Sequence, residues 1–282
     1  EAKSQFRLCG TTQWNYAKAK ADLATVAWSG QMVPILYRPF DTRTTVYNSN
    51  VAVHRRDRVM RHYVNHANVG LITGRQGHVV GTLDWNLAFI SGTISDFNLF
   101  YRGGGVTYPL YLYPEEGTLE TSARVNFDPK IYAQIREKAG LSESSPSTCD
   151  GEGDRAKGVV EGTATSKSPP SVAGATATSP SQVDGEDQRP DELRVFDYIY
   201  GVLHSPDYRR TYAQFLKIDF PRIPYPANPE VFAHVAEKGG QLRQLHLMED
   251  AAIGATPYPF NGEGDNVVVK PALSDEGPST GS

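Results

Sequence analysis

The chain has 282 residues and a formal net charge of −4; this length allows one large domain or two small ones, and this charge taken alone argues against a nucleic-acid partner. Its two cysteines, Cys9 and Cys149, lie far apart and outside any Cys/His cluster, which argues against a disulfide framework and a zinc site. Without a disulfide framework, the reducing cytoplasm is the expected compartment. No apolar run could span a bilayer and no signal-peptide pattern is present, so we expect no membrane partner.

The first 141 residues are predicted to contain a helix followed by several strands. Residues 1–27 carry apolar side chains at helical spacing, whereas residues 33–47 are rich in β-branched and aromatic residues and predict two strands joined by a turn. Residues 54–66 predict a short helix with one strongly basic side. Further strands are predicted at residues 69–73, 87–91 and 108–113.

A helix and an insertion follow. Residues 127–140 predict a helix that Asp128 caps, with Pro129 at its first position and Gly140 after its last turn. Residues 142–192 contain no aromatic residue and are dominated by small, polar and acidic residues. Such a segment cannot bury enough apolar surface to offset its ordering entropy, so we expect a disordered insertion.

The last third is predicted to be helical. Residues 193–216 predict two helices separated at Ser205-Pro206, and their aromatic residues are expected to be core. Residues 218–226 predict an extended crossing. Residues 228–248 predict a helix that begins at Asn228-Pro229 and is interrupted at Gly239-Gly240. A turn at 258–259 and a short strand at 267–270 are expected to follow. The whole chain is therefore predicted to be α+β, with a β-rich first half and a helical second half.

The charge is unevenly distributed along the chain. Residues 1–113 hold twelve Lys and Arg against six Asp and Glu, whereas residues 142–192 hold four against ten. A basic region of this kind points to a polyanionic partner in spite of the negative total.

No catalytic signature is recognisable. The sequence contains no GxxxxGK[ST] phosphate loop, no GxGxxG turn, no GxSxG elbow and no HExxH pair. The Asn-Pro-Pro-aromatic tetrapeptide that holds the target amine in adenine methyltransferases is also missing, because Asn228-Pro229 is followed by Glu230. We therefore predict no catalytic residue and no metal ligand, although a nuclease built on scattered acids stays open.

Residues suited to contacting DNA recur in the basic region. Arginine can donate two parallel hydrogen bonds to guanine, glutamine can pair similarly with adenine, and closely spaced arginines neutralise phosphates. We expect one DNA-facing surface, formed by Arg38, Arg43, Arg55, Arg56, Arg58, Arg75, Gln76 and Arg102.

Each of these candidates has a purely structural alternative. Asp41 could pair with a neighbouring arginine while the aromatic residues of 37–43 pack in the core. The run 54–66 could be a solvated helix face, 73–78 a polar turn between two strands, and 100–105 a hairpin tip.

Several of these segments, taken in order, resemble one family. They are YRPFDTR at 37–43, Arg75-Gln76, YPLYLY at 108–113, YIYGVLHSPDYR at 198–209 and YAQFLKIDFPRIPYP at 212–226. They resemble the C-terminal region of type ISP (type I single-polypeptide) restriction–modification enzymes and related adenine-specific DNA methyltransferases. The resemblance covers residues 30–141 and 193–226, continues more weakly to 271, and is most specific from 198 to 226.

The resemblance implies a domain organisation. Residues 1–36 would be the end of a helical coupler. The target-recognition domain would consist of a β-rich part, 37–141, and a helical part, 193–282, separated by the insertion 142–192. It would recognise a short asymmetric site in double-stranded DNA and present one adenine for methylation at N6.

The resemblance also implies partners outside this chain. The chain opens on Glu1, so we expect it to be a piece of a longer polypeptide. An upstream methyltransferase domain would bind S-adenosylmethionine, and nuclease and helicase-like domains, where present, would use ATP and Mg, with no cofactor in this fragment. The chain departs from the family pattern in its long insertion and in the lack of a further tail after Ser282.

Two other classes stay open at this point. A metal-dependent nuclease or other hydrolase would be favoured by clustered Asp, Glu and His side chains with perturbed pKa values. A protein-interaction module of a phage-defence complex would be favoured by a large exposed apolar patch.

Overall fold

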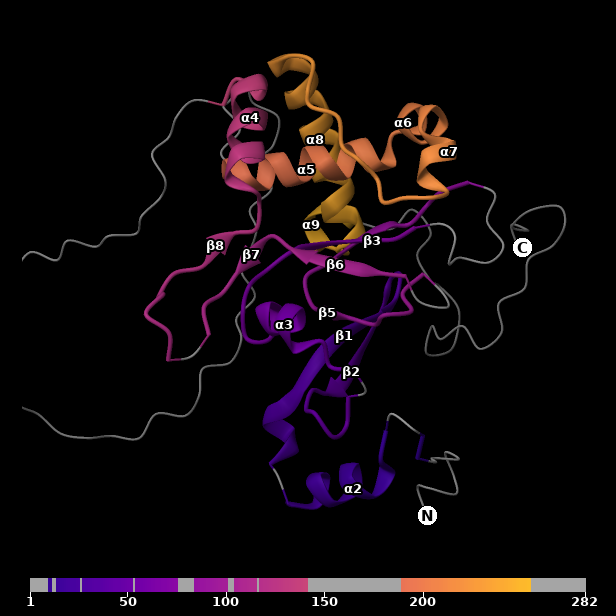
Figure 1. Cartoon of the computed structure of the whole chain (residues 1–282), viewed down its shortest axis with the longest axis vertical. Helices are drawn as coiled ribbons and strands as arrows, with labels where there is room; N and C mark the ends of the chain where they lie inside the picture. The colour runs from indigo at the N-terminus through magenta and orange to yellow at the C-terminus, as the bar shows by residue number, and fades with distance from the viewer. Residues whose placement is uncertain are drawn as a thin grey trace, which may run out of the picture.

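The computed structural model describes residues 10–11, 14–25, 27–52, 54–75, 84–100, 104–115, 117–141 and 189–254. These residues form an α+β fold, as the sequence predicts (Figure 1). The predicted insertion lies outside the described residues up to residue 188, and so do the turn and strand predicted after residue 254.

The N-terminal part contains one helix and a long hairpin. Helix α2 (Tyr16–Thr25) and a short 3₁₀ helix, η1 (Trp28–Gln31), precede β1 (Met32–Arg38) and β2 (Asp41–Val46). The two strands pair antiparallel, which confirms the predicted strand, turn and strand, and β5 (Ile94–Ser95) adds to β1 in parallel. Strand β1 runs across the proposed boundary after residue 36, and Leu36 in this strand is part of the core.

A second sheet has β3 at its centre. Strand β3 (Gly70–Thr73) pairs antiparallel with β4 (Ala88–Ser91) on one side and with β6 (Val106–Pro109) on the other. The predicted strand at 108–113 is divided, because Leu110 separates β6 from β7 (Tyr111–Leu112), which pairs with β8 (Arg124–Val125). The predicted basic helix is short, and consists of α3 (Asp57–Met60) and the 3₁₀ helix η2 (Arg61–Tyr63).

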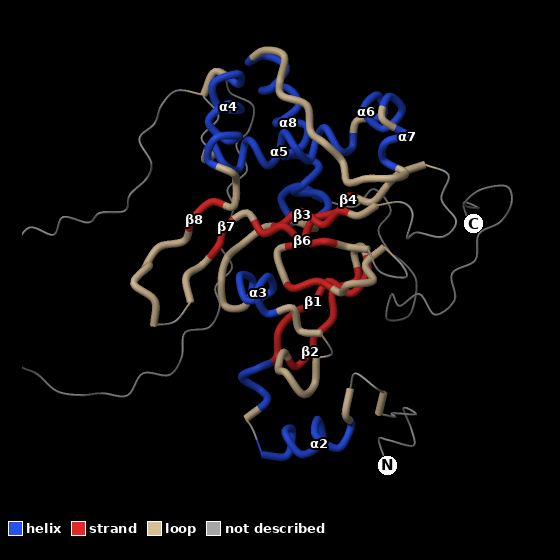
Figure 2. Tube along the Cα trace, viewed as in Figure 1, coloured by secondary structure: helices blue, strands red, loops and turns tan. Residues whose placement is uncertain are grey.

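The helices that follow residue 128 lie together at one end of the molecule, whereas α2 lies at the other end (Figure 2). Their limits follow the predicted caps: Asp128, Ser205 and Asn228 each accept backbone N–H bonds, and Gly140 ends its helix with φ 67°. The helices are α4 (Pro129–Ala139), α5 (Asp191–His204), α6 (Pro206–Thr211), α7 (Ala213–Leu216), α8 (Pro229–His246) and α9 (Asp250–Ile253).

Helix α5 begins two residues before the predicted boundary at Leu193. The carboxylate of Asp191 lies 3.0 Å from Nη2 of Arg136, and Glu192 accepts a hydrogen bond of 3.0 Å from the hydroxyl of Tyr111. Asp191 and Glu192 are acidic, like many residues of the predicted insertion. Their partners Arg136 and Tyr111, distant in the sequence, hold them in the helix.

The interruption predicted at Gly239-Gly240 is wrong, because α8 continues through both glycines. Helix α5 crosses α8 at this point, and a Cβ at Gly239 would lie only 1.9 Å from the carbonyl oxygen of Asp197. The glycines allow the two backbones to approach closely.

The predicted β-rich and helical halves share one core. Trp85, Leu87 and Ala88 pack with residues of α5 and α8, among them Val195 and Phe232. The aromatic residues of α5 are core, as predicted. Among the described residues, no helix is long and apolar enough to cross a bilayer.

Candidate nucleic-acid interface

The turn of the β1–β2 hairpin gathers two arginines around one tyrosine. The guanidinium carbon of Arg38 lies 3.9 Å from the centroid of the Tyr37 ring, and that of Arg43 lies 4.1 Å from it. Cation–π contact of this kind holds a guanidinium flat against a ring and limits the rotamers of a long side chain.

Each of these arginines is also bonded to a carboxylate. Asp41 accepts hydrogen bonds from Nε of Arg43 at 3.1 Å and from Nη2 at 2.8 Å. Asp96, which directly follows β5, accepts one from Nη1 of Arg38 at 3.0 Å. The hydrogen bond from Arg43 lowers the pKa of Asp41, so this carboxylate is charged at neutral pH. We name Tyr37, Arg38, Asp41, Arg43 and Asp96 the hairpin cluster.

The structural alternative for residues 37–43 had two parts, an Asp41–arginine pair and aromatic residues in the core, and only the first is confirmed. Asp41 does pair with a neighbouring arginine, as that alternative has it. Phe40, however, is 56% exposed, and its backbone adopts a left-handed conformation with φ 63°. The turn thus presents its charged residues and part of an aromatic ring at the surface.

The residues after β5 connect the hairpin to the basic run before β3. Asp96 binds Arg38, and the ring of the next residue, Phe97, lies 3.9 Å from the guanidinium carbon of Arg56. Phe97 is itself 44% exposed. Arg38 and Arg56 are consequently held on adjacent supports, although the sequence gives no local signal for this contact.

Three arginines of the basic run 54–66 were predicted to contact DNA, and one of them forms an ion pair. Arg55 lies 3.3 Å from Asp57. Arg56 and Arg58 are exposed, and neither forms an ion pair with an acid in the part of the chain that the structure describes. Arg56 also adopts a left-handed backbone conformation, with φ 50°. Two positive charges in this run therefore stay available to a ligand.

The remaining candidates, Arg75, Gln76 and Arg102, do not lie in the hairpin cluster or the basic run. Arg75, at the end of β3, is exposed, and its guanidinium carbon lies 5.5 Å from the centroid of Phe220, after α7. It is thus supported by the helical half and not by the hairpin cluster. Gln76 and Arg102 lie outside the described residues.

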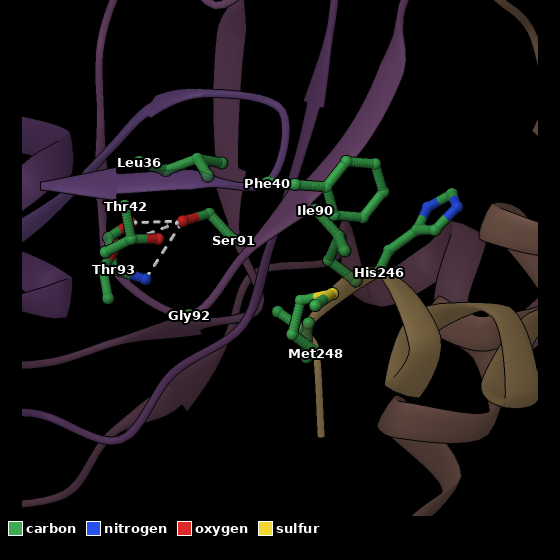
Figure 3. Close-up of a pocket in the computed structure, with 10 residues that line it drawn as sticks. Leu36, Phe40, Thr42, Ile90, Ser91, Gly92, Thr93, His246 and Met248 are labelled. Carbon is green, nitrogen blue, oxygen red and sulfur yellow. Dashed lines mark hydrogen bonds between the residues drawn. The ribbon is translucent and has the colours of Figure 1, made fainter. Parts of the chain in front are cut away.

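A shallow pocket of about 330 Å³ lies beside the hairpin turn (Figure 3). The rings of Phe40 and His246 lie edge to face in its lining, with centroids 5.5 Å apart (Figure 3). The hydroxyl of Ser91 donates to the carbonyl of Thr93 at 2.9 Å, and Nδ1 of His246 lies 2.6 Å from the hydroxyl of Tyr200. Ser91 is thus bonded to Thr93, and His246 to Tyr200. Ser91 and His246 do not form a nucleophile–base pair that points into the pocket.

Among the described residues, no three His, Cys, Asp or Glu side chains lie close enough together to hold a metal ion. The arrangement that these residues do form is a set of guanidinium groups supported by aromatic rings. Such a set can donate hydrogen bonds to phosphates or to the edges of bases.

These features agree with one class of protein. The model of the type ISP C-terminal specificity domain matches residues 3–280, so the chain belongs to this family. No curated protein matches the chain.

Two solved structures have a similar fold. The DrdV–DNA complex shares 20% identity with a TM-score of 0.52, over 81% of this chain and 17% of that one. The ATP-dependent type ISP restriction–modification enzyme LlaBIII bound to DNA shares 19% identity with a TM-score of 0.50, over 83% of this chain and 12% of that one. The chain thus spans less than a fifth of either protein.

Proposed function

We propose that this specificity domain recognises duplex DNA for a restriction–modification enzyme, through a surface centred on the β1–β2 hairpin and α3. The observation that carries the proposal is that three arginines lie on neighbouring supports. Tyr37 contacts both Arg38 and Arg43, and the adjacent residues Asp96 and Phe97 contact Arg38 and Arg56. The DNA-bound relatives of similar fold support the nature of the ligand.

The unpaired arginines suit the backbone of DNA. Arg56 and Arg58 carry full charges at the surface, and neutralising a phosphate releases a condensed counterion, so each such contact adds to the salt dependence of binding. We assign these two residues, with Arg55 beside them, to phosphates. Arg75 and, outside the described residues, Gln76 and Arg102 complete the proposed surface.

The proposal extends to the longer polypeptide. LlaBIII is described as ATP-dependent, and this chain covers only 12% of it. We propose that a methyltransferase domain upstream of this chain binds S-adenosylmethionine and methylates an adenine at N6. Any motor or nuclease domain would use ATP and Mg. The enzyme would work in the bacterial cytoplasm, where its DNA is.

Binding to a random-sequence duplex across a salt series tests the proposal. We expect micromolar affinity that falls steeply as salt rises. The double variant Arg56→Gln/Arg58→Gln should bind every sequence more weakly, and its slope of log affinity against log salt should be about 2 units shallower. Glutamine preserves most of the side-chain stem, so the loss of charge is the main change.

A matched control removes two charges from the helical half. Arg210 and Lys238 are both exposed, on α6 and α8. The variant Arg210→Gln/Lys238→Gln should keep the wild-type slope. Equal slopes for all three proteins would contradict the phosphate assignment, and a folded wild-type sample that does not bind at low salt would contradict DNA binding itself.

A further inference from the structure

Resting on the proposed function, we propose that Arg43 recognises the edge of a base and not a phosphate, and that Asp41 is the positioning residue that imposes this choice. The chemistry recognised is a pair of hydrogen-bond acceptors in the major groove, as O6 and N7 of guanine provide.

The hydrogen bonds of Arg43 leave one defined set of donors free. Asp41 accepts from Nε and Nη2, which form one edge of the guanidinium group. A guanidinium has five N–H donors, so the two on Nη1 and the outer one on Nη2 stay available. These donors lie side by side at the end of the group, which is the geometry needed for two parallel bonds to guanine.

The orientation of these free donors is fixed in two directions. Asp41 holds the group in its own plane, while the Tyr37 ring supports its face at 4.1 Å. A side chain that is ordered before binding loses little entropy when it binds, and it presents its donors at one angle. Orientation matters for a base edge, whereas a phosphate accepts donors from many directions.

The net charge of the Arg43–Asp41 pair also favours a base edge over a phosphate. Arg43 and Asp41 together carry no net charge, so a phosphate approaching Arg43 meets a carboxylate within 3 Å of it. A base edge is neutral overall and can use the free donors without breaking the ion pair. The pair therefore disfavours the phosphate and leaves the base edge unaffected, which is how a repulsive element sets specificity.

Arg38 is less able than Arg43 to present free donors to a base edge. Its Nη1 donates to both the carbonyl of Tyr37 and the carboxylate of Asp96. Its side chain is 35% exposed, compared with 59% for Arg43. Arg38 therefore supports the hairpin cluster, and Arg43 presents free donors to the solvent.

Selection of duplexes from a randomised library by the 282-residue chain tests the assignment. The wild type should select guanine at one position that depends on Arg43. The variant Arg43→Lys preserves the charge but not the rigid planar pair of donors, so the preference should weaken at that position and at no other. Replacing the selected guanine by 7-deazaguanine removes N7, and should weaken wild-type binding about tenfold and Arg43→Lys binding by less.

The variant Asp41→Asn tests the positioning role. It frees the charge of Arg43, so affinity for random duplex should rise, the salt slope should steepen by about 1 unit, and the preference at the Arg43 position should weaken. The pair Asp219→Asn and Arg222→Lys, an exposed Arg–Asp pair after α7, is the matched control and should change none of these.

The alternatives give different results. If Arg43→Lys selects the base at every position as strongly as the wild type does, the assignment is overturned. If Asp41→Asn leaves the salt slope and the preference unchanged, the positioning role is overturned. Salt-dependent wild-type binding without any selected sequence would overturn the inference but keep DNA binding, whereas no binding at all would remove the proposed function as well.

Discussion

Two of the Asp–Arg pairs in this chain, one in the helical half and one on the hairpin, have different roles. In the helical half, Asp197 is fully buried and accepts hydrogen bonds from Arg243 and Arg189. On the hairpin, Asp41 holds Arg43 at the surface. The chemical groups are the same, so their surroundings decide whether the pair stabilises the fold or presents donors to a ligand.

The buried pair presents almost no donor to the solvent, because Arg243 is 8% exposed and Asp197 is fully buried. Arg243 is almost buried, and it donates to both oxygens of Asp197 while a third contact lies at Glu249. Burial raises the pKa of Asp197, and the two arginines oppose that shift. Removing one partner would leave a buried charge unpaired, which is costly, whereas breaking a surface pair costs little.

The largest effect should come from Asp197→Ala. It leaves Arg243 buried without its carboxylate, and we expect a loss of about 4 kcal/mol in the free energy of unfolding. Chemical denaturation measures this loss. Asp207→Ala, which breaks the exposed pair with Arg210, is the control and should cost under about 0.5 kcal/mol. Similar losses in both variants would break the comparison between buried and exposed pairs.

The close approach of α5 and α8, which brings Asp197 to Arg243, should be almost as sensitive. In Gly239→Ala the new Cβ would meet the carbonyl of Asp197 at 1.9 Å, so the helices must separate. We expect a loss of about 3 kcal/mol by the same denaturation measurement. At Gly30, where a Cβ would meet nothing within 4 Å, the change to Ala should be almost neutral. A neutral Gly239→Ala would show that α8 can move freely.

The helical half should also be sensitive to pH. Burial lowers the pKa of His204 from 6.5 to about 4. The hydrogen bond with the carbonyl oxygen of Tyr200 opposes this shift, whereas the nearby charges of Arg209 and His246 add to it. Below about pH 6.5 the unfolded chain binds a proton at His204 that the folded chain does not, so stability falls as the pH falls towards 4. We expect a loss on the order of 2 kcal/mol over this range.

Denaturation at neutral pH and near pH 5 measures the pH effect. His204→Gln should lose part of it, and His234→Gln, which changes an exposed residue of α8, should preserve it. If His204→Gln and the wild type show the same pH dependence, the effect has another origin.

The smallest effect on stability is expected at the hairpin. Asp41→Asn breaks an exposed ion pair, so the midpoint of unfolding should not change measurably. The same variant should alter DNA selection. A clear loss of stability in Asp41→Asn would show that the hairpin pair is structural, like the pair at Asp197.

Local signals made much of the fold predictable. The caps at Asp128, Ser205 and Asn228 depend on a side chain and the backbone two or three residues away, so the sequence alone located these helix starts. The hairpin of β1 and β2 follows from strand propensity and its turn. The family was also recognisable from short motifs, and a match over residues 3–280 confirms it.

Contacts between distant residues decided the rest. Asp96 and Phe97, which support Arg38 and Arg56, were not predicted, because Asp96 lies 58 residues from Arg38 in the sequence. The path of α8 through Gly239-Gly240 depends on α5 crossing it, and the start of α5 depends on Arg136 and Tyr111. The sequence determined which residues could donate to DNA. Only the tertiary structure decided which of those donors are already occupied, because a charge is paired or free according to what the fold places beside it.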